Sequence, residues 1–240
     1  MNKRSLILYT LIIFNLSINP VIAGPFDLLN QGNSSSSVKE VNLNSLSYNA
    51  SRLIMRVGKA TIAFAESSTT MYEAIGEKEK AEKLRALVDE VKKKQNDEES
   101  IKKFVENKEV NQAFEDLGNI DLNSKKQMVV SVEQLVTAFG QLGGGINLDT
   151  KAVEDAKSLT TEATGLVDLV KSNPLKYGFS AFTTVNSVLS SGKFIVDNVP
   201  NQIVNIQSFS EKLIQYFKTN NIPIPSPDKL QKIADEMEKG

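Results

Sequence analysis

FGQLGGGINLD (residues 139–149) contains the only run of three consecutive glycines in the chain. Such a run is typical either of a phosphate-binding loop or of a place where the backbone changes direction. A phosphate-binding loop requires a preceding strand and the order Gly-x-x-x-x-Gly-Lys-Ser/Thr, whereas the residues before these glycines have helical spacing and no Gly-Lys-Ser or Gly-Lys-Thr occurs. We therefore predict that Gly143–Gly145 end one helix and that Asp149 caps the next, forming an αα-hairpin.

Helical spacing extends over most of the chain on both sides of the glycines. From Asn42 onward, apolar residues recur at intervals of three, four and seven, which is the period of an amphipathic helix. No alternating strand pattern of useful length and no repeat of fixed period interrupts this spacing. The sequence predicts an all-α fold: a multi-helix bundle of roughly seven to nine helices, including short ones, without a β-sheet.

Capping residues, glycines and prolines divide this pattern into separate helices. We expect helices to begin near residue 44, at Asn96 with Glu99 as a capping box, at Asp121 or Asn123, and at Pro174 and Pro227. We expect helices to stop at Gly76, Gly118 and Asn220–Asn221, and the chain to kink or restart at Val199–Pro200.

The N-terminus has the three parts of a secretory signal peptide. Lys3 and Arg4 precede an apolar run, Leu6 to Phe14, and Val21 and Ala23 supply small residues before Gly24. The apolar run is too short for a bilayer core, which needs ~20 residues. We expect a signal peptide at 1–23, a flexible polar leader at 24–41, a helical bundle at 42–221, and a proline-rich linker with a short C-terminal helix at 222–240.

The composition argues against several classes of chemistry. The chain has no cysteine, which excludes disulfides and thiolate sites, and no histidine, which excludes Ser-His-Asp hydrolysis and histidine-ligated metals. The formal net charge is −1, and no basic stripe with interleaved aromatics appears, so we expect no nucleic-acid binding. A cysteine-free exported chain fits the bacterial periplasm, with release outside the cell as the alternative. We predict no enzyme activity and no cofactor.

Charged residues are concentrated between Glu77 and Glu109, where their signs alternate. Pairs at i,i+4 such as Glu79–Lys83 and Glu90–Lys94 are typical of a solvated outer helix. An electrostatic docking surface is the alternative, but it would require the signs to segregate.

The segment from Tyr177 to Gly192 carries no charge. Two functional interpretations attach to it, membrane association and an apolar ligand groove, beside the simpler one of a shielded central helix. The candidate apolar contact residues are Phe179, Phe182, Val185 and Leu189.

These observations favour an exported, non-enzymatic helical bundle that acts as a binding or scaffold module, with an envelope protein as its expected partner. The alternative is a lipid- or membrane-associating bundle, an apolar-ligand binder or helical pore-former, that uses the segment 177–192.

Overall fold

The computed structural model describes residues 43–122 and 128–239, which form seven helices and no strand. The predicted all-α bundle is therefore confirmed, whereas the expected signal peptide and polar leader lie outside the described residues. In chain order the helices are α2 (Leu43–Ala74), α3 (Lys78–Lys93), α4 (Glu98–Val105), α5 (Lys108–Gly118), α6 (Val132–Ser172), α7 (Pro174–Thr219) and α8 (Pro227–Lys239).

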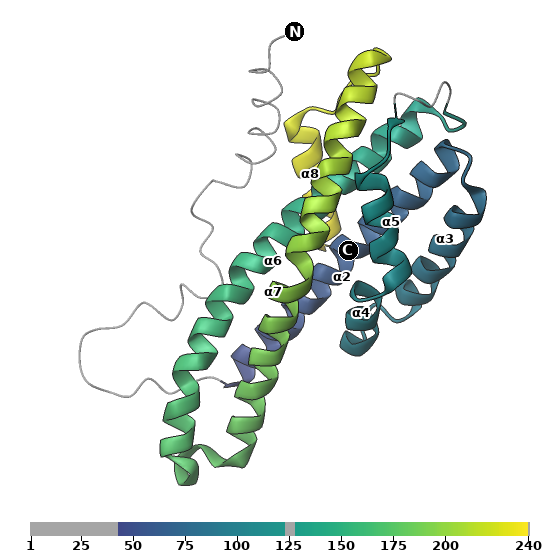
Figure 1. Ribbon diagram of the computed structural model, residues 1–240. Helices are drawn as coiled ribbons and strands as arrows, with labels where there is room; N and C mark the ends of the chain where they lie inside the picture. The colour runs from purple at the N-terminus through teal and green to yellow at the C-terminus, as the bar shows by residue number, and fades with distance from the viewer. Residues whose placement is uncertain (1–42, 123–127, 240) are drawn as a thin grey trace.

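Three long helices make the body of the molecule. Helices α6 and α7 form an antiparallel hairpin, and α2 packs against both of them (Figure 1). The short helices α3, α4 and α5 cover one flank of α2, while α8 folds back onto α6. At one end the α6–α7 hairpin continues past the start of α2 and projects from the body (Figure 1).

The predicted turn at Gly143–Gly145 is wrong, because α6 runs without interruption from Val132 to Ser172. None of the three glycines has a positive φ. Of the three, Gly145 permits close approach, because a Cβ there would overlap the ring of Phe64 in α2. Gly140, earlier in α6, does the same for α8, since a Cβ on it would lie 2.5 Å from Cδ1 of Ile233. Helical glycine costs about 1 kcal/mol relative to alanine, and here the packing of two neighbouring helices offsets that cost.

Several other predicted helix starts are also wrong, and local hydrogen bonds explain them. Asp149 is no cap but a buried residue inside α6. That helix begins at Val132 and not at Asp121, because the side chains of Ser131 and Gln134 form a capping box. The alternative start, Asn123, lies outside the described residues. Helix α4 is capped by Asp97, which accepts from Ser100 N at 3.0 Å, and not by Asn96.

Most predicted helix ends are confirmed. Gly76 follows α2 with φ 83°, and α5 stops at Gly118. Proline opens both α7 at Pro174 and α8 at Pro227, where its fixed φ suits the first helical turn. The chain does not restart at Pro200, since α7 continues through it.

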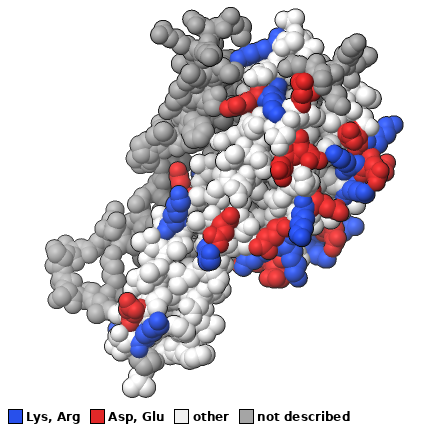
Figure 2. Space-filling view, viewed as in Figure 1, with Lys and Arg blue, Asp and Glu red and all other residues white. Residues whose placement is uncertain are grey.

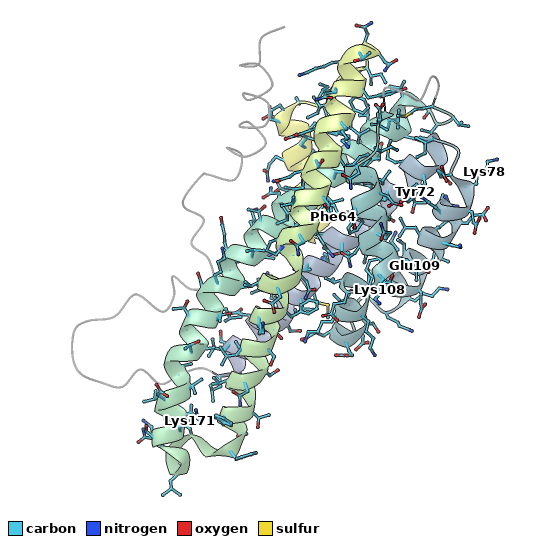
Figure 3. All side chains as sticks on the ribbon, viewed as in Figure 1. Phe64, Tyr72, Lys78, Lys108, Glu109 and Lys171 are labelled. Carbon is cyan, nitrogen blue, oxygen red and sulfur yellow. The ribbon has the colours of Figure 1, made fainter. Side chains whose placement is uncertain are left out.

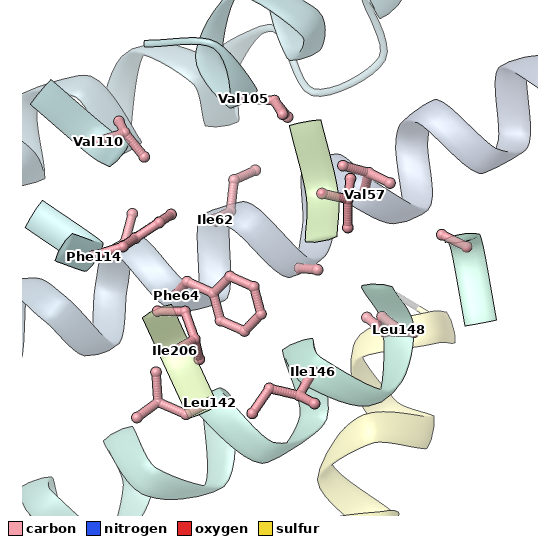
Figure 4. Packing of buried hydrophobic residues seen from close by; sticks show 14 of the residues in the cluster. Val57, Ile62, Phe64, Val105, Val110, Phe114, Leu142, Ile146, Leu148 and Ile206 are labelled. Atoms are coloured by element: carbon pink, nitrogen blue, oxygen red, sulfur yellow. The ribbon is translucent and has the colours of Figure 1, made fainter. Parts of the chain in front are cut away.

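Phe64 lies at the centre of the core. Its ring points into the space between Leu142, Ile146 and Ile206, which joins α2, α6 and α7 (Figure 4). On the other side it meets Phe114 of α5 edge to face, with ring centroids 5.8 Å apart. The contact that α6 makes at Gly145 therefore connects the long hairpin with the flanking short helices.

Buried hydrogen bonds of the Gln202 side chain connect three parts of this apolar core. The side-chain amide of Gln202 in α7 donates to Val105 O and to Asn111 Oδ1, both at 3.1 Å. Its carbonyl oxygen accepts from Thr61 Oγ1 in α2 at 3.2 Å. These bonds satisfy a buried amide and fix α7 against α2 and the α4–α5 junction.

Gly145→Ala tests whether the glycines serve close packing. In most helices this change stabilises, but here the new methyl group overlaps Phe64, so we expect a loss of about 1–3 kcal/mol in the free energy of unfolding. Gly165→Ala is the matched control, because the space around Gly165 in α6 is open, and it should stabilise by about 0.5–1 kcal/mol. Denaturant unfolding of both variants measures the difference, and equal gains would contradict the packing role.

Candidate functional site

The four candidate apolar contact residues do not share one surface. Phe179 is 84% exposed, whereas Val185 is fully buried and Phe182 and Leu189 pack partly buried against the core. The last three belong to the stripe that faces the rest of the bundle. Of the predicted set, only Phe179 is freely available to a partner.

Phe179 lies in the hairpin tip, residues 171–180, where α6 ends and α7 begins. Leu175, in the same tip, is fully exposed. Between these two residues Gly178 leaves helical geometry, with φ 73° and ψ 168°, a conformation that glycine adopts without strain. The tip is the far end of the projecting hairpin, marked by Lys171 in Figure 3. It thus presents two large apolar side chains to solvent.

Sequence reasoning missed Leu175. Leu175 directly follows Pro174 in the first turn of the predicted helix, and nothing in that local pattern indicates exposure. The exposure of Leu175 follows from the projection of the hairpin beyond α2, because no other helix within residues 43–122 and 128–239 reaches the tip. That projection depends on the length of α6 and therefore could not be read from the local sequence.

Two lysines flank the apolar residues of the tip. The ammonium of Lys171 lies 5.9 Å from the ring centroid of Phe182, and that of Lys176 lies 5.2 Å from the centroid of Tyr177. Such cation–π contacts hold an ammonium near an aromatic ring without neutralising it. From Ala163 to Gly192 the only other charged residue is Asp168.

The flank formed by α3, α4 and α5 is far more charged than the hairpin tip. Figure 2 shows blue and red side chains interspersed over the α3–α5 flank, while much of the α6–α7 hairpin is white. The predicted pairs form, with Lys83 Nζ 2.8 Å from Glu79 and Lys94 Nζ 3.0 Å from Glu90. Arg85–Glu73 and Lys92–Glu66 pairs also tie α3 to α2. This flank is a surface of paired charges.

A groove of about 380 Å³ lies between α3 and α5 on this flank. Asp116 in the groove accepts from Lys80 Nζ at 3.1 Å and from Gln112 Nε2 at 2.9 Å. Tyr72 of α2 also lines the groove, with the Lys80 ammonium 5.4 Å from its ring centroid. The groove is lined by Tyr72, Lys80, Lys83, Leu84, Lys108, Glu109, Gln112, Ala113 and Asp116.

Two groups that line the groove, Tyr72 and Asp116, have shifted pKa values. Burial, and then the negative charge of Asp116, raise the pKa of the Tyr72 phenol far above its usual range. The hydrogen bonds from Gln112 and Lys80 outweigh partial burial and lower the pKa of Asp116. Tyr72 therefore stays protonated and Asp116 stays ionised at neutral pH, so neither group is poised for proton transfer.

Asp149 is the most perturbed acid among the described residues. It is completely buried within α6, and neither carboxyl oxygen has a hydrogen-bond partner. Burial raises its pKa well above the ordinary value, and no charged neighbour contributes. A catalytic acid must reach a substrate, and Asp149 lies outside the α3–α5 groove and is enclosed by the core. We read it as a core acid that is held neutral.

The described residues contain neither an acidic metal-binding cluster nor a helix that could cross a membrane. No group of three or more acidic residues within residues 43–122 and 128–239 is arranged to hold a metal ion. Over the same residues, no helix has the length and apolar character needed to cross a bilayer.

Comparisons of the chain with protein-family models, with curated proteins and with solved structures give no significant match. Its function must therefore be argued from its own geometry.

Asp149→Asn tests the neutral core acid through pH. The folded protein binds the proton of Asp149 more tightly than the unfolded chain does, so its contribution to stability is complete below about pH 4 and falls as pH rises through the folded pKa. The asparagine variant has no proton to lose at this position, so its stability does not fall for this reason. Relative to the wild type, its free energy of unfolding should therefore rise by up to about 1.4 kcal/mol per pH unit above pH 4.

Denaturant unfolding between pH 4 and pH 8 measures this gain, and Asp168→Asn, an exposed change in the same helix, is the control. Parallel pH profiles for wild type and Asp149→Asn would contradict the assignment.

Proposed function

We propose that this chain is a non-enzymatic binding protein of the bacterial envelope, and that its contact surface is the hairpin tip. The observation that carries the proposal is the exposure of Leu175 and Phe179 at the end of a projecting helix pair. Burying a leucine or phenylalanine side chain gains about 1.5–3 kcal/mol. The two exposed side chains at the tip would therefore gain this free energy if a binding partner removed them from water.

The rest of the bundle supports a model in which the tip makes the contact and the packed core holds the tip in place. The glycine contacts of α6 and the buried Gln202 bridge hold the hairpin on a packed core, so the tip is presented by a well-supported element. Export is proposed from the signal-peptide pattern at 1–23, which places the expected partner in the envelope. The absence of histidine and cysteine, together with the paired charges of the α3–α5 flank, supports a role without catalysis.

An apolar-ligand groove in the segment 177–192 is a weaker candidate. Val185 and Val188, two of its large apolar residues, are buried in the core and are not available to line a groove. Membrane association is still supported, because the exposed residues Leu175 and Phe179 at the tip are sufficient for it.

Envelope fractionation in the native host tests the proposal. The wild-type protein should sediment with the envelope, and Leu175→Ser/Phe179→Ser should move most of it into the supernatant because both apolar contacts are lost. Both positions are exposed, so the double variant should unfold at the wild-type temperature.

Val204→Ser is the matched control for fractionation, since Val204 is 62% exposed on α7 but lies outside the tip. Equal sedimentation of wild type and the tip variant would argue against the proposed contact surface.

A further inference from the structure

We propose that the partner of the hairpin tip is the surface of an anionic lipid bilayer. In this arrangement Leu175 and Phe179 insert among the lipid headgroups, and Lys171 and Lys176 lie against lipid phosphates. The inference rests on the proposed function, since it names the partner of the same surface.

The shape of the tip favours a bilayer over a folded protein. A stable protein interface buries about 800 Å² on each partner and involves 20–30 residues a side. The tip is the rounded end of two helices, and its large exposed apolar side chains are Leu175 and Phe179. A protein partner would need a concave surface to enclose it, whereas lipid headgroups rearrange around a projecting side chain.

The charges of the tip fit an anionic surface. Lys171 and Lys176 are exposed on either side of the α6–α7 connection, and Asp168 lies about one turn further back along α6. Basic residues beside a membrane are attracted to anionic lipids, and this attraction fades within a Debye length. Both lysines belong to the tip, and Lys176 directly follows Leu175 in the chain.

Uncharged polar residues complete the tip. Ser172, Asn173 and Ser180 are exposed between and beside the apolar residues. Their hydroxyl and amide groups can exchange hydrogen bonds with water for hydrogen bonds with headgroups. An interfacial anchor reaches ~5–10 Å into the boundary between headgroups and acyl chains, a depth that suits side chains at a tip and needs no spanning helix.

The chain has no tryptophan, so one introduced indole reports on its own position. We would prepare Phe179→Trp and the control Val204→Trp in the protein as its host exports it, because both positions are exposed and should accept the change. Each would be titrated with vesicles of phosphatidylethanolamine and phosphatidylglycerol, and with vesicles of phosphatidylcholine. The emission of the indole at position 179 should shift to shorter wavelength with the anionic vesicles, while that of the indole at position 204 should stay unchanged.

A charge variant separates the two parts of the anchor. Lys171→Gln/Lys176→Gln in the Phe179→Trp background should raise the lipid concentration at half-maximal shift about tenfold or more on anionic vesicles. It should have little effect at high salt, where the lysines are screened. Leu175→Ser in the same background should weaken binding at both salt concentrations.

Three outcomes would overturn the inference. Equal shifts at positions 179 and 204 would mean that binding does not use the tip. No shift at position 179, while envelope sedimentation still depends on Leu175 and Phe179, would make the partner a protein and leave the proposed function standing. If the indole emission at position 179 does not shift and the tip variant sediments like the wild type, both the lipid partner and the proposed function are contradicted.

Discussion

The close approach of α6 to α2 at Gly145 is the contact on which the other features depend. Because Gly145 has no Cβ, the ring of Phe64 can lie against the α6 backbone and fill the space between three long helices. Gly140 admits Ile233 of α8 in the same way. These contacts keep α6 helical through its glycines, and an uninterrupted α6 is long enough to carry the hairpin tip beyond the body.

The molecule separates charge from exposed apolar surface. Basic and acidic side chains pair with one another across α2, α3 and α5, which leaves the α3–α5 flank with little net charge. The tip, in contrast, has lysines over aromatic rings and apolar side chains in solvent. Leu175 and Phe179 have the largest exposed fractions of any large apolar side chains among the described residues, and both lie at the tip.

Much of the fold was predictable because it is encoded locally. Proline at the first turn of α7 and α8, and glycine after α2, act within a few residues, and their effects were predicted correctly. The all-helical class followed from apolar spacing alone.

The errors arose where tertiary contacts outweigh local preference. A run of glycines is typical of a turn, and the contact that favours a helix at Gly145 comes from Phe64, which is distant in sequence. Asp149 resembles a cap because acids are usually exposed, and its burial depends on the same continuous helix. For the site, Phe179 was identified from a charge-free segment, but Leu175 was missed because its exposure depends on how far the hairpin extends.

The most direct test of this account is the length of α6 in solution. The chain contains no cysteine, so spin labels attached at Glu133→Cys and Ser172→Cys, both exposed, report a single distance by pulsed electron resonance. A continuous helix predicts a narrow distribution of distances at about 60 Å, at 1.5 Å per residue. A distribution centred at about 25 Å would mean that the chain reverses at the glycines. That result would contradict both the packing at Gly145 and the projection of the tip.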